Sequence, residues 1–223
     1  MTVTEAMQAR HSVRAYQDRA IEPGVREKLA AELSACNAAG GLDMRLAFDE
    51  PKAFSSFLAR YGKFSGVCNY VAVLGKKADD LNERAGYWGE RFVLFAQSLG
   101  LNTCWAALTF GKGAAKKAAA PGKGEKFVCA IALGYGQTQG VPHKSRPLSE
   151  VAVAENAPEW FLRGAEAALL APTAVNQQKF RFTLVGERAV RAERTGGFYS
   201  DIDLGIVKYH FEQGAGKENF DWV

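Results

Sequence analysis

Hydrophobic residues along the chain recur at two different spacings. Met44, Leu46 and Phe48 alternate with Arg45 and Ala47, which predicts a β-strand with two different faces. Two longer apolar runs, at residues 68–75 and 127–134, have strand length and are rich in β-branched and aromatic or aliphatic residues. The second run is continuously apolar, which is typical of a strand in a sheet covered on both faces.

Helical spacing predicts the other elements. The largest apolar stripe consists of Trp88, Phe92, Phe95, Ala96 and Leu99. This stripe is expected to pack in the core, and Gly100 is expected to end its helix. Further helices are predicted at about residues 2–10, 24–34 and 204–211, and a further alternating strand from Phe180 to Leu184.

The order of helix, loop, alternating strand and glycine-bearing helix occurs twice. Residues 33–48 align with residues 169–184, and the helix before Gly100 aligns with the segment before Gly216. Identity between the copies is low and the two alignments need different offsets, so a chance match is the alternative. We predict an internal duplication, with residues 1–157 as the first half and residues 158–223 as a shorter second half of one compact unit.

The composition is that of a globular protein. The 223 residues are 48% hydrophobic and 23% charged, which excludes a disordered or fibrous chain. The formal net charge of +4 is too small to imply nucleic acid unless the charges cluster. A small anionic ligand is the more economical partner.

The cysteines and the N-terminal sequence predict neither a metal site nor a targeting segment. Cys36, Cys68, Cys104 and Cys129 are widely separated, so each is expected to be a small buried apolar residue. The first residues contain no apolar stretch typical of a signal peptide, and polar residues interrupt the longest charge-free stretch, 92–110. We expect a cytoplasmic protein with no membrane partner.

Two basic segments have the chemistry of an anion site. Arg10 and Arg14 flank Ser12 after the first predicted helix, and two guanidiniums with one hydroxyl suit a phosphate monoester. Lys144 and Arg146 flank a serine in the same way after a predicted strand. The alternative for the first segment is an exposed basic helix end, where arginine also favours the helix dipole, and the alternative for the second is a solvated loop.

A neutral polar loop lies between a predicted helix and a predicted strand. Pro172 prevents the helix from continuing. Thr173, Asn176 and Gln178 then supply a hydroxyl and two amides, and amides can both donate to and accept from the edge of a heteroaromatic ring. The alternative is a loop whose polar groups satisfy its own backbone.

No catalytic motif accompanies these segments. The three histidines have no cysteine or acidic partner at metal-ligand spacing, and the sequence contains no Walker or GxGxxG motif. An enzyme with this sequence would therefore depend on a bound cofactor for its chemistry.

Four segments, taken together, resemble the nitroreductase-like flavoproteins. The segments are RHSVRAY at 10–16, FVLFAQSLGLNTCW at 92–105, FVCAIALGYG at 127–136 followed by KSRPLSEV, and APTAVNQQ at 171–178. They are similar to the family's R-x-S-x-R-x-[FY] opening, its central helix, its late strand with a basic loop, and its S-x-x-N-x-Q loop. The resemblance implies an α+β sandwich with a mostly antiparallel sheet flanked by helices.

The same resemblance implies an FMN-dependent oxidoreductase. NAD(P)H would reduce the flavin at N5, and the flavin would then reduce a nitroaromatic, a quinone or a similar acceptor in a ping-pong reaction. No catalytic side chain is assigned, because the flavin performs the chemistry. The residues implied to bind FMN are Arg10, His11, Ser12, Arg14, Ala107, Leu108, Lys144, Arg146, Thr173, Asn176 and Gln178.

These residues divide by role within the resemblance. The cations and Ser12 would hold the phosphate and ribityl chain, and the loop at 173–178 would bind the ribityl or isoalloxazine edge. The turn at 106–109 would offer backbone N–H groups near N5. Family members often have glycines in this turn, so Ala107 and Leu108 depart from the pattern.

The position of the neutral loop also departs from the family. In ordinary members this loop comes about 30 residues after the R-x-S-x-R segment and reaches across from a partner subunit. Here the residues at that place, 34–42, lack its pattern. Opposite Thr173, Asn176 and Gln178 stand Asn37, Gly40 and Leu42. The chain resembles the subgroup in which one chain imitates the dimer. One FMN per monomer is expected, with a weak dimer as the alternative.

Two other classes of function stay open at this point. One is a flavin-binding carrier or sensor without turnover, and the other is a descendant with an empty site and no redox role. The intact cations at Arg10, Arg14, Lys144 and Arg146 argue against the empty site. NADH oxidation in the presence of menadione would separate an enzyme from a carrier.

Overall fold

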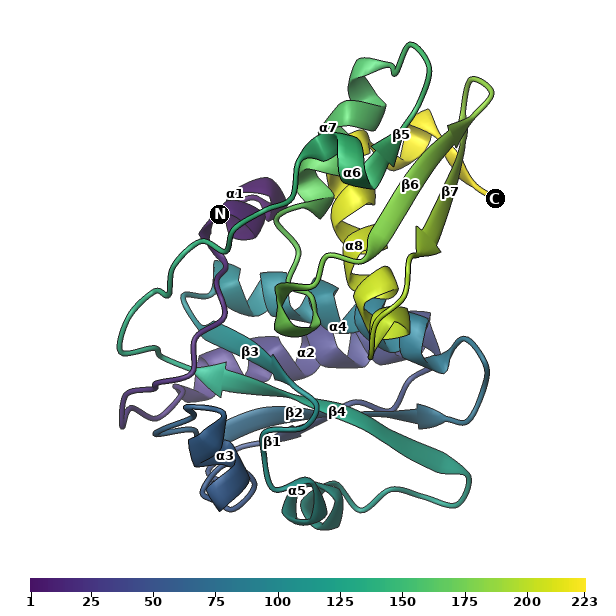
Figure 1. Ribbon diagram of the computed structural model, residues 1–223. Coiled ribbons are helices and arrows are strands. Elements are labelled where there is room, and N and C mark those ends of the chain that lie inside the picture. Colours follow the sequence, from purple (N-terminus) through teal and green to yellow (C-terminus); the bar gives the residue numbers. More distant parts are fainter.

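The computed structural model describes residues 1–223 and contains two separate β-sheets (Figure 1). The first is antiparallel throughout, in the order β1-β2-β4-β3, and the second has the order β5-β6-β7-β8. In the second sheet the central pair is antiparallel and the two outer pairs are parallel. The strands are β1 Arg45–Ala47, β2 Asn69–Lys76, β3 Asn102–Ala106, β4 Glu125–Gly134, β5 Ala152–Val153, β6 Phe180–Val185, β7 Ala189–Arg194 and β8 Asp221–Trp222.

Helices cover both faces of the first sheet. In Figure 1, α2 and α4 lie on the face toward the second sheet, and α3 and α5 lie on the opposite face. Helices α7 and α8 pack together beside the second sheet, and α8 also packs on α4. The helices are α1 Val3–Ala9, α2 Pro23–Gly40, α3 Phe57–Tyr61, α4 Leu81–Ser98, α5 Lys112–Ala119, α6 Leu148–Val151, α7 Glu159–Ala168 and α8 Ser200–Ala215, with 3-10 turns η1 Ala174–Asn176 and η2 Lys217–Asn219.

The predicted fold class is confirmed. The structure is α+β, with an antiparallel sheet flanked by helices. Its larger core lies between α2, α4, α7, α8 and the sheets, and a second apolar cluster lies under α3 and α5. Strands β2 and β4 are buried between these two clusters, which explains why both are apolar on both faces.

Most of the predicted elements form where the pattern placed them. Strands β1, β2, β4 and β6 occupy the predicted segments, and α4 ends just before Gly100, whose φ of +80° lies in the left-handed region. The helix predicted at 24–34 was too short. It continues through residues 35–39, three of which are alanine, to Gly40, and Gly41, with a φ of 59°, caps it.

Two further corrections concern a helix start and a cysteine. Helix α8 begins at Ser200 rather than Leu204, because its polar first turn hides the apolar periodicity. Cys68 is half-buried, whereas the other three cysteines are buried as predicted. Cys68 lies directly before β2 rather than within the buried strand.

The internal duplication and the division at residue 157 stay predictions. Strand β5 precedes that division but pairs with β6, so the first range contributes to the second sheet.

At the crossing of α4 and α8, glycines from both helices let the two backbones touch: Gly86 lies against the carbonyl of Ile202, and Gly205 lies against that of Glu83.

Candidate functional site

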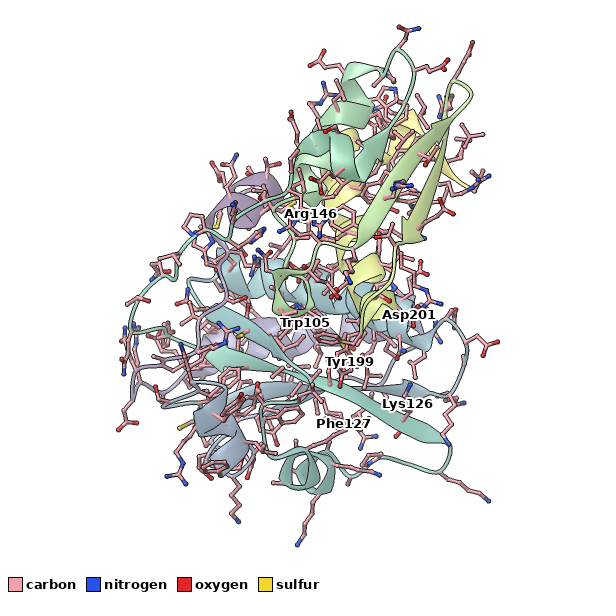
Figure 2. All side chains as sticks on the ribbon, viewed as in Figure 1. Trp105, Lys126, Phe127, Arg146, Tyr199 and Asp201 are labelled. Atoms are coloured by element: carbon pink, nitrogen blue, oxygen red, sulfur yellow. The ribbon has the colours of Figure 1, made fainter.

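A cavity of about 290 Å³ opens between the first sheet and the start of α8. Most of its lining is apolar, including Trp105, Pro172, Val175, Phe198, Tyr199, Ile202 and Ile206. Its side-chain polar groups are Ser12, Arg14, Thr109, Thr173 and Asp203. In Figure 2, Trp105 and Tyr199 lie in the region where the first sheet faces α8. An apolar cavity with few polar groups is the usual form of a small-molecule site.

The cavity collects some of the residues expected to bind a flavin and leaves others outside. It is lined by Ser12, Arg14, Ala107, Leu108 and Thr173. The remaining expected residues, Arg10, His11, Lys144, Arg146, Asn176 and Gln178, do not line it. The N-terminal segment and the β3–α5 turn therefore meet the neutral loop at one place.

Ser12 and Arg14 reach the cavity because their segment lies along β3. The backbone N–H of Val13 donates to the carbonyl of Thr103 at 3.0 Å, and Ser12 forms a parallel bridge with the same residue. Val13 points into the core, which turns its neighbours outward. Arg14 is exposed, makes no ion pair within the chain, and has its guanidinium carbon 6.0 Å from the centre of the Phe64 ring.

The neutral loop is docked onto the basic loop. The side-chain amides of Asn176 and Gln178 both donate to the carbonyl of Lys144 at 2.8 Å. The Gln178 side-chain oxygen accepts from the backbone N–H of Arg146, also at 2.8 Å. The structure thus brings the neutral loop and the basic loop together. The two amides, however, form hydrogen bonds to the backbone of the basic loop instead of pointing free into the cavity.

The basic loop offers its charges to solvent rather than to the cavity. Lys144 and Arg146 are exposed, and Arg146 pairs with Glu150 at 2.8 Å. His143 and Ser145 both contact the carbonyl of Leu169, at 2.9 and 3.2 Å, which ties this loop to the end of α7. His11 is half-buried, and burial together with the nearby Arg10 lowers the pKa of its imidazole.

The neutral loop has a strained backbone at the cavity. Val175, Asn176 and Gln178 have φ angles of 46°, 56° and 45°. A β-branched residue such as Val175 rarely adopts a positive φ, and strain of this kind persists only where surrounding contacts enforce it. Val175 is 80% exposed and lines the cavity, so its own packing does not enforce the turn.

Arg10 belongs to a buried polar cluster behind the cavity. Its Nε lies 3.7 Å from Glu90 on α4, and its Nη2 donates to the carbonyl of Leu170 at 3.3 Å. Glu90 also accepts from the indole N–H of Trp105 at 2.8 Å and contacts His210 of α8 at 3.0 Å. All of Arg10, Glu90 and His210 are buried, and burial lowers the pKa of the Arg10 guanidinium.

Sequence analysis did not identify Glu90 and His210. Both lie on the buried faces of their helices, and a polar residue on a buried helix face is a signal of an internal polar cluster. Their partners are distant in the sequence, so the pairing itself has no local signal.

Asp203 is the second feature that sequence analysis did not identify. It lies in the first turns of α8, is 6% exposed and lines the cavity. Its carboxylate accepts from the backbone N–H of Ala174 at 2.9 Å and from the side-chain amide of Gln177 at 2.7 Å. Burial raises the pKa of Asp203 to about 6, and these two hydrogen bonds limit the rise.

Asp203→Asn is expected to stabilise the protein at neutral and alkaline pH. Because the folded pKa of about 6 lies above the ordinary value of 3.8, folding favours the protonated carboxyl. Its contribution to stability is full below about pH 4 and is lost as the pH rises through about 6. A shift of this size corresponds to about 3 kcal/mol, so the variant should gain up to about that free energy of unfolding at about pH 8 and little at about pH 4.

Urea unfolding at the two pH values measures this difference. Asp201→Asn is the matched control, since Asp201 is 43% exposed at its side chain and pairs with Arg194 on the surface. The control should show no pH-dependent gain. A loss of stability in Asp203→Asn at about pH 8 would contradict the assignment of a costly buried carboxylate.

No group of three or more histidine, cysteine, aspartate or glutamate side chains is placed to hold a metal ion. None of the helices combines the length and the apolar character needed to cross a bilayer.

Comparison with known proteins places this architecture in context. The family model described as "Putative TM nitroreductase" matches residues 2–215. No curated protein matches the sequence.

Solved structures share the fold at low sequence identity. A crystal structure described as a "putative nitroreductase" from Thermotoga maritima is 24% identical and covers 98% of this chain and 85% of its own, with a TM-score of 0.69. A nitroreductase family protein from Streptococcus pneumoniae is 11% identical to this chain. The match covers 69% of this chain and 100% of that protein, with a TM-score of 0.56. A third structure is a variant of NfnB, described as an FMN and NADPH-dependent nitroreductase from Sphigopyxis sp. strain HMH. It is 15% identical to this chain, and the match covers 68% of this chain and 97% of that protein, with a TM-score of 0.53.

Proposed function

Because the chain belongs to the nitroreductase family whose model spans residues 2–215, we propose that it is an FMN-dependent oxidoreductase with its flavin in the cavity beside Ser12 and Arg14. Support for the cofactor comes from the neighbour described as FMN and NADPH-dependent. NAD(P)H would be the reductant, and a nitroaromatic, quinone or similar small molecule would be the acceptor.

The donor set of the cavity fits FMN. Arg14 has no acidic partner, so its charge is available to a phosphate, and Ser12 beside it supplies a hydroxyl. The apolar walls contributed by Trp105, Ile202 and Ile206 suit the flat, largely apolar isoalloxazine ring. We propose that Arg14 and Ser12 hold the phosphate end and that Thr173 contacts a polar edge of the ring or ribityl chain.

Bound FMN would supply the redox chemistry, accepting a hydride from NAD(P)H and passing electrons to the acceptor. The chain itself binds and orients. Trp105 is fixed by its hydrogen bond to Glu90, and the strained turn at Val175 is held over the cavity by Ala174, whose N–H bonds to Asp203. Asn176, Gln178, Lys144 and Arg146 would act on the cofactor only after exchanging some of their present contacts.

The observation that carries the proposal is an unpaired arginine at an apolar cavity. Arg14→Ala should weaken FMN binding about 10- to 150-fold, because a charge-assisted hydrogen bond is worth about 1.5–3 kcal/mol. Fluorescence titration of the apoprotein with FMN measures this loss. Arg181→Ala, which removes an exposed arginine from β6, is the matched control and should leave FMN affinity unchanged.

The purified protein provides the direct test. Heat release and chromatography should identify FMN, and sedimentation read at the flavin absorbance should show one FMN per chain at monomer mass if the chain acts as a pseudo-dimer. NADH or NADPH oxidation with menadione should then proceed. FAD or no flavin would refute the cofactor, flavin only at twice the chain mass would refute the pseudo-dimer, and bound FMN without turnover would favour a carrier or sensor.

A further inference from the structure

Two segments form one continuous surface on the outer side of the first sheet. Residues 52–63 include α3 and residues 112–123 include α5, and Figure 1 shows both helices on the sheet face opposite α2 and α4. The segments touch where the N–H of Gly111 donates to the carbonyl of Ala53 at 2.6 Å and the rings of Phe54 and Phe110 stack at 5.6 Å. We call their exposed residues the α3–α5 face.

The α3–α5 face is strongly basic. Its exposed cations are Lys52, Arg60, Lys63, Lys112, Lys116, Lys117 and Lys123. Neither segment contains an acidic residue, and none of these seven cations forms a salt bridge. The whole chain has a formal net charge of only +4, so the rest of the molecule is net negative. The charge is therefore concentrated on this one face.

Large apolar side chains stand among these cations. Phe57, Leu58 and Tyr61 of α3 are 75%, 52% and 78% exposed. They occupy a single turn of helix, while Ala59 of the same helix is buried and holds α3 against the sheet. Exposed apolar side chains gathered in one place mark a binding surface, since isolated ones are normal but clusters are not.

Chemistry distinguishes among the polyanionic partners that this face could bind. Six of the seven cations are lysines, which are depleted at protein–protein interfaces but suit the anionic headgroups of lipids. A single-stranded nucleic acid would stack bases on Phe57 and Tyr61 but would leave the exposed Leu58, which has no ring, without a partner. A protruding apolar turn ringed by lysines matches the interfacial layer of an anionic bilayer, where aromatic side chains enter the headgroup region.

We propose that the α3–α5 face binds the surface of anionic lipid bilayers. This differs from the sequence-based expectation of no membrane partner, because only the fold places the lysine-rich segment 112–123 beside residues 52–63 and exposes the apolar side chains of α3. Binding would be peripheral. It goes beyond the proposed oxidoreductase function and does not require bound flavin.

The α3–α5 face lies beside the cavity, so its binding to a bilayer would also affect the position of the cavity. Gly62 directly follows α3, Thr109 lies a short distance before α5, and both line the cavity. A molecule bound through this face would hold that side of the cavity close to the bilayer. Apolar small molecules dissolved in the lipid would then be concentrated near it.

Co-sedimentation of the full-length protein with vesicles tests the proposal. Binding should be strong to vesicles containing phosphatidylglycerol, weak to vesicles of phosphatidylcholine alone, and reduced by added salt. Lys116→Gln with Lys117→Gln should lower the partition coefficient about 25-fold, since each lysine contributes about fivefold at an anionic surface. Phe57→Ser with Tyr61→Ser should also weaken binding, and this loss should persist at high salt.

Matched controls separate the face from the total charge. Arg181→Gln with Arg191→Gln removes the same charge from the exposed β6–β7 hairpin and should leave vesicle binding unchanged. Equal loss in both double variants, or no preference for phosphatidylglycerol, would overturn the proposal. Two other outcomes would also overturn it. In the first, Phe57→Ser with Tyr61→Ser abolishes a dimer in sedimentation without affecting vesicle binding. In the second, a single-stranded oligonucleotide binds the face while vesicles do not.

Discussion

Replacing Glu90 by alanine is expected to lower the free energy of unfolding by about 3–5 kcal/mol, because it leaves a buried arginine without its charge partner. Glu90 is fully buried on α4 and joins Arg10, Trp105 and His210, which come from three other parts of the chain. Its removal leaves the buried Arg10 charge without a counter-ion, although Arg10 keeps its bond to the Leu170 carbonyl, and leaves the Trp105 indole N–H without an acceptor. Urea unfolding by circular dichroism measures the loss.

A variant on the same helix controls for the loss of a carboxylate. Glu83 pairs with Lys208 at 2.6 Å near the surface, and Glu83→Ala should cost only about 0–1 kcal/mol. Glu90→Gln keeps the shape and one acceptor oxygen, so its cost should lie between the two. If Glu90→Ala were no less stable than Glu83→Ala, the buried cluster would not contribute as described.

The Glu90 variants should also change the cavity. Trp105 lines it, and its indole N–H has Glu90 as its only hydrogen-bond partner. Without that bond the ring is expected to become more mobile, which a change in tryptophan fluorescence at low denaturant would report. Such a change in Glu90→Gln, where the fold survives, would identify Glu90 as a positioning residue for the cavity wall.

Gly205→Ala is expected to destabilise the protein by more than about 4 kcal/mol, a large share of the roughly 5–15 kcal/mol by which an ordinary domain is stable. A Cβ at Gly205 would lie 2.6 Å from the backbone nitrogen of Tyr87 and closer still to the carbonyl oxygen of Glu83. Both obstacles are backbone atoms of α4, so the clash cannot be relieved by a rotamer change. Relief requires α8 to move away from α4 along the largest helix–helix contact in the fold.

Gly113→Ala is the matched control for the same substitution in a helix. Gly113 lies in α5 and a Cβ there would meet no atom within 4 Å. This variant should be stabilised by about 0.5–1 kcal/mol, because alanine favours the helix and has less freedom when unfolded. Thermal unfolding and the soluble yield of both variants test the pair. A Gly205→Ala protein with unchanged stability would show that the two helices do not cross as closely as described.

The sequence by itself predicted the elements whose signals are local. Apolar runs identified β2 and β4, and the stripe on α4 identified a core helix, because the interior imposes the strand and helix periods on the chain. Strand β7 had no such signal, since most of its side chains are not buried. The patterns around Arg14 and Thr173 also led to three residues that line the cavity, namely Ser12, Arg14 and Thr173.

Only the tertiary structure decided which polar residues meet. Arg10 and Arg14 look equivalent in sequence, yet Arg10 is enclosed by Glu90 and the end of α7 while Arg14 faces the cavity. The amides of Asn176 and Gln178 bond to Lys144, and the acid that lines the cavity is Asp203. The physical reason is that charge pairing and burial depend on atoms brought together by folding, and sequence periodicity reports only which way a side chain faces.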